Sequence, residues 1–188
     1  IREFYYPFES GLKAGTAEVY DHEIPGGQYS NLRPQAIALG LEHRFEQIKK
    51  NYVAVNHMFG DIVKVTPSSK VVGDMAMFMT ANGLSAEDVM EQGDTLAFPD
   101  SVIDLFSGKL GQTEGGFPPE LTAKILKGRK QLEQAPGAAL EPVEFETEFK
   151  AFKQEFSDRL SELDFLSYKM YPDVFRGYFE HRREFGDI

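Results

Sequence analysis

The sequence predicts a mainly α-helical protein whose helices form an irregular assembly. Apolar residues recur at three- and four-residue steps in several segments, which is the period of a helix that buries one face. Capping residues or proline precede these segments, and glycine or proline follows most of them. The connectors are short, and the 188 residues contain no evident internal repeat or low-complexity segment. This length is enough to bury one moderate core.

The amino-terminal part predicts an irregular segment followed by two helices. Residues 1–30 are rich in glycine and aromatic side chains, and Pro25-Gly26-Gly27 is typical of a turn with unusual backbone angles. A helix is expected over 31–39, because asparagine can cap its start and Gly40 can end it. A second helix is expected over 42–57, where four apolar residues repeat at helical spacing: Phe45, Ile48, Tyr52 and Val55.

A strand-to-helix turn is expected next. Residues 62–65 form a short β-rich run, Thr66 is a good N-cap, and Pro67 suits the first position of the following helix. Asn82-Gly83 should close that helix. Gly73 lies inside it and disfavours a helix by roughly 1 kcal/mol relative to alanine. A neighbouring element is therefore expected to approach the helix closely at Gly73.

Three shorter helices complete this region of the sequence. Ser85 begins one, with two acidic residues in its first turn, and another follows Pro99 and ends at Gly108. The stretch 111–119 predicts a loop because it contains three glycines and two prolines. A third helix is expected from the end of that loop, at 118–126.

The clearest boundary in the sequence is the stretch Pro136–Pro142, which combines proline, glycine and alanine. We therefore divide the chain into residues 1–135 and 136–188. Beyond the boundary, phenylalanines at four- and three-residue steps predict a helix with an aromatic seam used for packing: Phe145, Phe149, Phe152 and Phe156. Pro172 should end one further helix and open the last.

Composition excludes several classes of function. Thirty acidic and twenty basic side chains give a formal charge of −10, which repels a nucleic-acid backbone. The longest apolar stretches, such as Met75–Met79, are too short to cross a membrane. The absence of cysteine excludes disulfides, thiolate nucleophiles and thiolate metal sites.

The best candidate for chemistry is the turn at Thr66, where hydroxyl groups and one cation surround a predicted helix start. Ser68, Ser69 and Lys70 fall in the first turn, where free backbone N–H groups and the helix dipole favour oxygen-rich ligands. The alternative is that Thr-Pro-Ser-Ser is an ordinary helix cap without chemistry. The residues of the turn alone leave both interpretations open.

The turn and its surroundings resemble the pyruvate carboxylase family. Two motifs of that family are matched at its spacing, His22–Leu32 and Gly60–Asp74. Shorter matches extend the resemblance over almost the whole chain: Leu96–Val102, Gly115–Pro118, Pro136-Gly137 and Met170–Phe175. The resemblance implies the C-terminal, funnel-like helical part of a TIM-barrel carboxyltransferase domain, without the barrel itself, and a helical linker over 136–188 that leads toward the inter-domain, allosteric region.

The resemblance also implies a reaction and three site residues. In that family a carboxyl group passes from carboxybiotin to pyruvate, and the oxaloacetate formed serves anaplerosis and gluconeogenesis. The residue matching Thr66 relays a proton between the pyruvate methyl group and the biotin ureido group. The residues matching Ser69 and Lys70 belong to the biotin pocket. A threonine hydroxyl can donate and accept in one step, as a concerted relay requires.

Cofactors and partners follow from the same resemblance. The implied biotin sits on a carrier domain outside this chain, and the parent enzyme's ATP and divalent metal bind elsewhere, the metal to the barrel. Expected partners are the rest of the barrel, the carrier domain and pyruvate. The parent is expected to be a cytoplasmic homotetramer, or a mitochondrial-matrix enzyme in a eukaryote. The 188-residue portion alone should be inactive.

Other polar residues are assigned structural roles. The four histidines lack the close pairing of metal sites, so we predict no intrinsic metal site: His22, His43, His57 and His181. His22 is interpreted as a satisfied structural group, and Lys64 as a solvated or salt-bridged cation.

Two alternatives to the pyruvate carboxylase interpretation stay open. One is the α subunit of oxaloacetate decarboxylase or a related transcarboxylase, whose motif reads Val-Thr-Pro-Thr-Ser-Gln-Ile-Val-Gly. This chain differs from that motif at Ser68, Lys70 and Asp74. The other is a non-catalytic helical module for packing or interaction, in which the polar turn is a cap.

Overall fold

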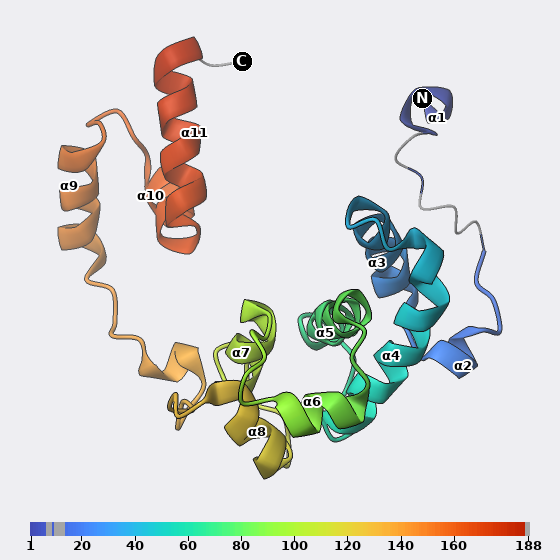
Figure 1. Ribbon diagram of the computed structural model, residues 1–188. Coiled ribbons are helices and arrows are strands. Elements are labelled where there is room, and N and C mark those ends of the chain that lie inside the picture. Colours follow the sequence, from blue (N-terminus) through green and yellow to red (C-terminus); the bar gives the residue numbers. More distant parts are fainter. Residues whose placement is uncertain (7–8, 10–13, 187–188) are drawn as a thin grey trace. The chain divides into compact units, whose positions relative to one another are not determined.

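The computed structural model describes residues 1–6, 9 and 14–186, and these residues are helical or irregular, with no strand among them (Figure 1). The prediction of a mainly α-helical fold is confirmed. The chain divides into two compact units, residues 1–139 and 140–188. The functional assignment of 1–135 and 136–188 stays a prediction.

Unit 1 contains eight α-helices and two short 3-10 turns among its described residues. The α-helices are α1 Arg2–Tyr5, α2 Val19–His22, α3 Gly26–Ala38, α4 Phe45–Met58, α5 Ser68–Asn82, α6 Ala86–Gln92, α7 Asp100–Phe106 and α8 Pro119–Leu126. The 3-10 turns are Glu42–Arg44 and Pro136–Ala139. None of the described helices combines the length and the apolar character that crossing a bilayer requires.

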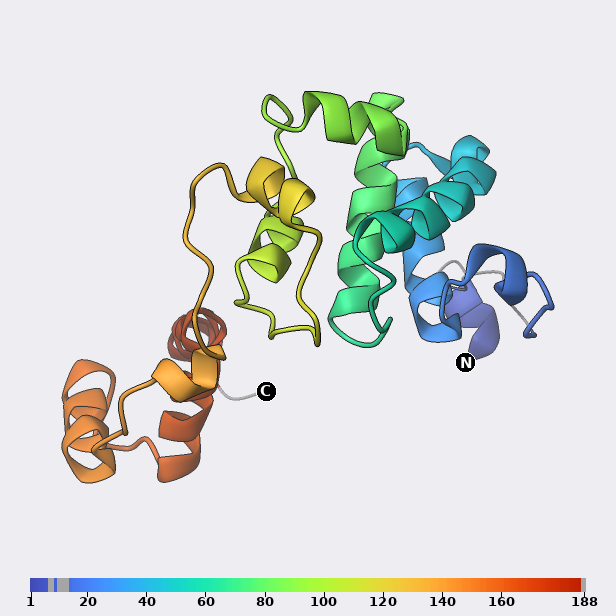
Figure 2. The ribbon, with the colours of Figure 1, turned by 90° about the horizontal axis from the view of Figure 1, so that it is seen from below.

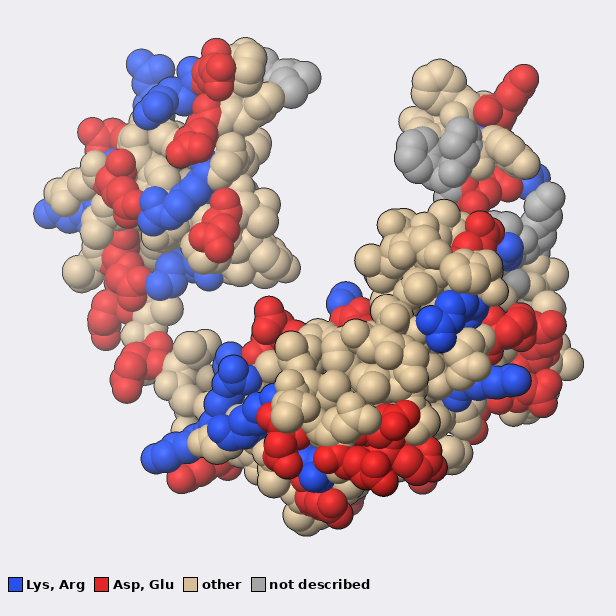
Figure 3. Space-filling view, in the orientation of Figure 1, with Lys and Arg blue, Asp and Glu red and all other residues tan. Residues whose placement is uncertain are grey.

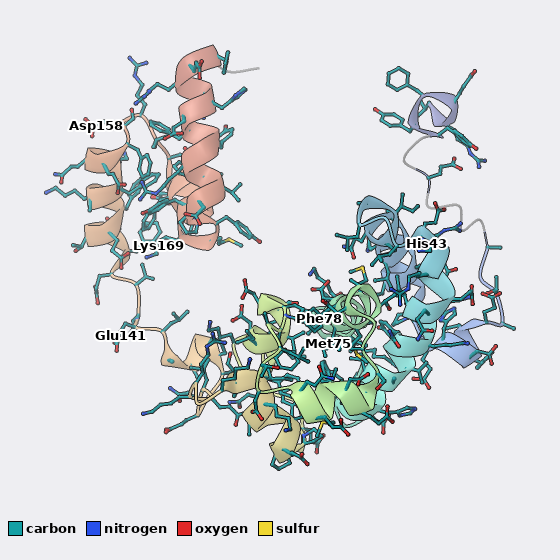
Figure 4. All side chains as sticks on the ribbon, in the orientation of Figure 1. His43, Met75, Phe78, Glu141, Asp158 and Lys169 are labelled. Atoms are coloured by element: carbon teal, nitrogen blue, oxygen red, sulfur yellow. The ribbon has the colours of Figure 1, made fainter. Side chains whose placement is uncertain are left out.

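Helix α5 is the centre of unit 1. It contacts α3 and α4 on one side and α7 on the other, an arrangement that two views show (Figures 1 and 2). Its apolar residues are buried around most of its circumference, and Met75, labelled in Figure 4, is fully enclosed. A helix that is apolar on nearly every side must be surrounded by other elements. The turn that precedes α5 therefore leads directly into the central helix of the core of unit 1.

Gly73 explains how closely α3 and α5 approach each other. A Cβ atom added at Gly73 would lie 2.7 Å from the Nε2 atom of Gln28 and 3.1 Å from a methyl group of Leu32, both on α3. Such distances are below ordinary van der Waals contact. The prediction of a close neighbour at Gly73 is confirmed.

The predicted start of α3 is wrong. The helix begins at Gly26, five residues before the expected Asn31, and Pro25 precedes it with an extended backbone. Pro25-Gly26-Gly27 is thus a helix entry, not a turn with unusual angles. Burial of Gln28 and Leu32 against α5 outweighs the low helix propensity of the two glycines. The irregular segment is correspondingly shorter than 1–30, and its residues 7–8 and 10–13 lie outside the described part.

The other helices of unit 1 lie close to their predicted positions. Helix α4 follows the 3-10 turn Glu42–Arg44, α6 starts after Ser85, α7 after Pro99, and α8 ends at Leu126. Gly108, which follows α7, has a positive φ of 85°, a conformation that glycine adopts without strain. The strand predicted over residues 62–65 is wrong, since these residues form no strand.

The surface of unit 1 carries its negative charge unevenly. In the space-filling view, acidic side chains gather over α6 and on the outer side of the unit, whereas few charges cover the region of α5 (Figure 3). The acidic residues of α6 itself are Glu87, Asp88 and Glu91. A nucleic-acid backbone would be repelled by this face.

Unit 2 is a three-helix arrangement around aromatic side chains, formed by α9 Phe145–Glu155, α10 Glu162–Met170 and α11 Pro172–Phe185. The predicted aromatic seam of α9 is confirmed, because Phe152 is buried and its ring lies within 5.4 Å of those of Phe165 and Phe175. The Arg176 guanidinium lies over two rings of this cluster. Lys169, labelled in Figure 4, joins α10 to α9 through an ion pair with Glu148 at 2.6 Å.

Candidate functional site

An open cavity of about 660 Å³ lies beside the turn that precedes α5. One wall is the segment Gly60–Ser68, and the opposite wall is formed by Leu105 and the loop 110–116. The apolar part of the lining is contributed largely by Ile62, Val63, Val65, Leu105 and Leu110. The polar part comes from short side chains and from the glycine-rich loop.

Thr66 lies on the wall of this cavity. Its side chain is exposed, and its hydroxyl makes no hydrogen bond within the part of the chain that the structure describes. The predicted N-cap role is therefore wrong: α5 starts at Ser68, the residue before it is Pro67, and no side chain caps its first turn. A hydroxyl that is not used for capping can donate to a ligand and accept from it.

The first turn of α5 also differs from the predicted anion site. The backbone N–H of Ser69 donates to the Val65 carbonyl at 2.9 Å, and that of Lys70 donates to the Pro67 carbonyl at 3.0 Å. These carbonyls occupy donors that were expected to be free. The first turn of α5 therefore offers a ligand fewer backbone donors than the sequence predicted.

Ser68 and Ser69 are both buried in this turn. The Ser68 hydroxyl bonds to the backbone of residues 63 and 65. The Ser69 carbonyl accepts a hydrogen bond from the Tyr52 hydroxyl at 3.2 Å. Tyr52 is fully enclosed, and burial raises the pKa of its phenol, followed by a smaller effect of the Glu23 charge. Tyr52 therefore stays neutral and holds the turn in place.

Lys70 is exposed and forms an ion pair with Asp74 at 2.6 Å. The same Asp74 oxygen accepts a hydrogen bond from the Ser101 hydroxyl on α7. Neither Ser69 nor Lys70 belongs to the lining of the cavity that contains Thr66. Of the three predicted site residues, the structure thus places Thr66 in the cavity, and the other two one turn of helix away.

The loop 110–116 is a part of the site that the sequence interpretation missed. Thr113 contributes a hydroxyl that is shielded from solvent and has no hydrogen-bond partner among the described residues. The Gln112 amide donates to the Leu132 carbonyl at 3.1 Å, which ties the loop to the chain beyond α8. Gly111, Gly115 and Gly116 have positive φ angles. The cluster of glycines was the sequence signal for this part of the site, because glycine allows the backbone to approach a ligand closely.

Two acidic side chains line the cavity, and Lys64 lies next to it in the sequence. Lys64 forms an ion pair with Glu23, so its predicted salt-bridged role is confirmed. Asp61, which lines the cavity, lies 2.6 Å from the Nδ1 atom of His57. Glu114 also lines the cavity, so the wall combines two carboxylates, at Asp61 and Glu114, with neutral hydroxyl and amide groups.

His22 has the structural role that the sequence suggested. Its side chain is buried, its Nδ1 atom accepts a hydrogen bond from the Ile24 backbone N–H at 3.0 Å, and its ring contacts Tyr29. Burial lowers the pKa of the imidazole, and the nearby Lys49 ammonium lowers it further. Within the described residues, no group of three or more metal-ligating side chains is close enough to hold an ion.

The fold and the site thus define a helical protein that holds an unbonded threonine hydroxyl on the wall of an open cavity. The chain belongs to the conserved carboxylase domain family, whose model matches residues 19–188. The curated relatives that it resembles are pyruvate carboxylases. The chain is 50% identical to pyruvate carboxylase of Bacillus subtilis and 47% identical to that of Staphylococcus aureus, in both cases over its full length.

Solved structures show the same fold. The carboxyl transferase domain of Rhizobium etli pyruvate carboxylase superposes with a TM-score of 0.87 at 44% identity over 98% of this chain. A second structure of that domain, solved with pyruvate and biocytin, also gives a TM-score of 0.87. The chain spans 16% of the length of the two bacterial relatives and 31% of the R. etli domain structures.

Proposed function

We propose that this chain is the C-terminal helical part of the carboxyltransferase domain of a pyruvate carboxylase. In this proposal it contributes to transfer of a carboxyl group from carboxybiotin to pyruvate, with oxaloacetate as product. The observation that carries the proposal is the free Thr66 hydroxyl on the wall of a cavity of about 660 Å³. The similarity to a carboxyl transferase domain solved with pyruvate and biocytin supports it.

The role of Thr66 is proton transfer. Carboxylation of pyruvate requires loss of a methyl proton, and the biotin ring that releases the carboxyl group must gain one. The Thr66 oxygen accepts the methyl proton while its own hydroxyl proton passes to the ureido group, so the side chain is unchanged after the step. This exchange depends on placement between the two partners and not on an altered pKa.

The groups present fit the ureido ring of biotin in part. When bound, biotin supplies the activated carboxyl group. A ureido ring is neutral and polar, and the cavity wall carries neutral donors and acceptors at Thr66 and Thr113. We assign Lys70 to the ureido oxygen because its ammonium has three donor hydrogens and Asp74 is its one described partner. Ser69 is assigned beside it, on the same helical turn.

The rest of the proposed enzyme lies outside this chain. The barrel would supply the pyruvate site and the divalent metal, a carrier domain would bring biotin, and a separate domain would use ATP to carboxylate it. We further propose a homotetrameric parent located in the cytoplasm, or in the mitochondrial matrix of a eukaryote. These assignments rest on the family.

The direct test is Thr66→Ala in the full-length enzyme. Carboxyl transfer should fall by at least about 10²-fold, because general acid–base groups contribute on that scale. ATP-dependent carboxylation of biotin should stay within twofold of wild type, roughly 0.4 kcal/mol. Both half-reactions are followed separately, by oxaloacetate formation and by phosphate release.

Thr66→Ser is the matched control, since it keeps the hydroxyl, and it should retain most of the transfer activity. Oxaloacetate formation by Thr66→Ala at near the wild-type rate would refute the proton-relay role.

A second test concerns Lys70. Lys70→Gln removes the charge and keeps one amide donor, so we expect a higher KM for free biocytin as carboxyl carrier, by roughly tenfold for one charge-assisted hydrogen bond. Lys169→Gln in unit 2 removes a lysine with an ion pair of equal length, 2.6 Å, and should leave this KM unchanged. Equal KM values for Lys70→Gln and wild type would exclude the assigned contact.

A further inference from the structure

The Ser68 hydroxyl is bonded entirely to the segment that precedes Thr66. Its Oγ atom lies 2.6 Å from the Val63 carbonyl and 2.7 Å from the Val65 carbonyl, and it accepts a hydrogen bond from the Val65 backbone N–H at 3.1 Å. One hydroxyl proton serves the two carbonyls. Ser68 is 7% exposed, so water competes little for these bonds.

Apart from the Ser68 bonds, the segment that carries Thr66 is attached by the Lys64–Glu23 ion pair and by backbone hydrogen bonds from α5. The Val63 and Val65 side chains are exposed by 75% and 59%, and therefore pack weakly against the unit. Thr66 itself makes no side-chain hydrogen bond within the described residues. Besides the Ser68 bonds, one further hydrogen bond joins Val65 to α5, from the Ser69 backbone N–H to the Val65 carbonyl at 2.9 Å.

We infer that Ser68 is a positioning residue that fixes the Thr66 hydroxyl in the cavity; this inference rests on the proposed function of Thr66. Ser68 also contributes to the cavity lining, but its hydroxyl proton is used by the backbone carbonyls. It therefore acts through the backbone and not on the ligand. Through its hydrogen bonds to Val63 and Val65, the first residue of the central helix α5 sets the position of Thr66.

The expected size of the effect follows from the sensitivity of catalysis to placement. A displacement of about 1 Å of a reacting group can reduce a rate by about 10²-fold. Without the Ser68 hydroxyl, the Val63 carbonyl and the Val65 N–H lose a partner, and the backbone bonds that remain next to Thr66 are those that the Val65 and Pro67 carbonyls accept from α5. We expect kcat of carboxyl transfer to fall between about tenfold and 10²-fold.

The experiment compares Ser68→Ala and Ser68→Thr in the full-length enzyme. Ser68→Ala should lower kcat of carboxyl transfer with little change in KM for pyruvate, and biotin carboxylation should stay within twofold of wild type. Ser68→Thr restores the hydroxyl and should recover kcat to within about threefold. Ser107→Ala is the matched control, because Ser107 is equally buried but bonds within its own helix end, to the Asp104 carbonyl, and lies outside the lining of the Thr66 cavity.

A double variant separates positioning from general destabilisation. On the Thr66→Ala background the hydroxyl to be positioned is gone, so Ser68→Ala should cause no additional loss of carboxyl transfer. A multiplicative loss in the double variant would overturn the inference, because it would show that Ser68 acts independently of Thr66. Failure of Ser68→Thr to recover activity above Ser68→Ala would overturn it as well.

The remaining outcomes are also decisive. If Ser68→Ala fails to fold, Ser68→Cys carries the test, since a thiol has similar size and is a weak hydrogen-bond donor. It should lower kcat, and wild-type kcat in that variant would overturn the inference. An inactive Thr66→Ala with a fully active Ser68→Ala removes the positioning role and leaves the proposed function intact. A fully active Thr66→Ala removes the proposed function first, and the positioning role with it.

Discussion

At Gly73 helix α3 approaches α5 so closely that a methyl group added to the glycine would overlap its neighbours. The nearest atoms to a Cβ at this position are the Nε2 atom of Gln28 and a methyl group of Leu32. The Gln28 amide nitrogen is buried without a hydrogen-bond partner among the described residues. A buried polar group without a hydrogen-bond partner is unfavourable. We therefore attribute the position of Gln28 to its close packing against the backbone of Gly73.

We predict that Gly73→Ala lowers the free energy of unfolding by about 1 kcal/mol. Overpacking a filled interface costs about 1–3 kcal/mol, whereas replacing glycine by alanine in a helix returns about 1 kcal/mol. Urea unfolding of the purified chain measures the difference. The control is the double variant Gln28→Ala/Gly73→Ala, which makes room for the methyl group and should recover most of the loss. A Gly73→Ala variant more stable than wild type would show that the side chains of α3 move aside for the methyl group without a loss of stability.

At the scale of single elements, α6 and α10 begin with the same capping box. In α6 the Ser85 hydroxyl accepts from the Asp88 N–H and the Asp88 carboxylate accepts from the Ser85 N–H; Ser161 and Asp164 repeat this in α10. The hydrogen bond from the Ser85 backbone lowers the pKa of Asp88, and the Ser161 hydroxyl lowers that of Asp164. Both helices are short, so their starts matter for their stability.

We predict that Ser85→Ala and Ser161→Ala each destabilise their own unit by about 1 kcal/mol, the usual effect of losing an N-cap. Amide hydrogen exchange assigns the loss to unit 1 or unit 2.

The contribution of the two capping boxes to stability also depends on pH. Because the aspartates have lowered pKa values in the folded state, their stabilisation is complete above the unfolded pKa of about 3.9 and disappears as the pH falls through the folded value. Identical acid unfolding in wild type and both variants would contradict this.

The sequence predicted some elements well because their signals are local. The helices after Ser85 and Pro99, and the break at Pro172, depend on capping and proline geometry within a few residues. The start of α3 could not be predicted this way, because its glycines become helical only through packing on α5. The contribution of Ser68 was missed for a related reason: its bonds run backward to residues 63 and 65 instead of forming a cap.

At the scale of the whole molecule, the described residues form two separate hydrophobic cores. The core of unit 1 surrounds α5, and that of unit 2 is the aromatic cluster around Phe152. The cavity that contains Thr66 belongs entirely to unit 1. Thr66 could be predicted as a candidate site residue from its hydroxyl-rich turn and from a family motif, whereas the opposite wall at 110–116 depends on tertiary structure.

We predict that the 188-residue chain forms no measurable oxaloacetate from pyruvate and carboxylated biocytin. In the proposed enzyme the cavity supplies only the proton-relay hydroxyl, and the barrel supplies the metal and the pyruvate site. The measurement is a coupled malate dehydrogenase assay, with the full-length enzyme as the positive control. Turnover by the isolated chain, abolished in Thr66→Ala, would show that the helical part is sufficient.

The exposed valines beside Thr66 have a practical consequence for handling the chain. Val63 and Val65 present two β-branched side chains to water next to a hollow. Apolar side chains that lie together on an exposed surface favour association between copies of a chain, and the association increases with protein concentration. Concentrated preparations of this chain should therefore scatter light before dilute ones do, and Val63→Lys should reduce the scattering.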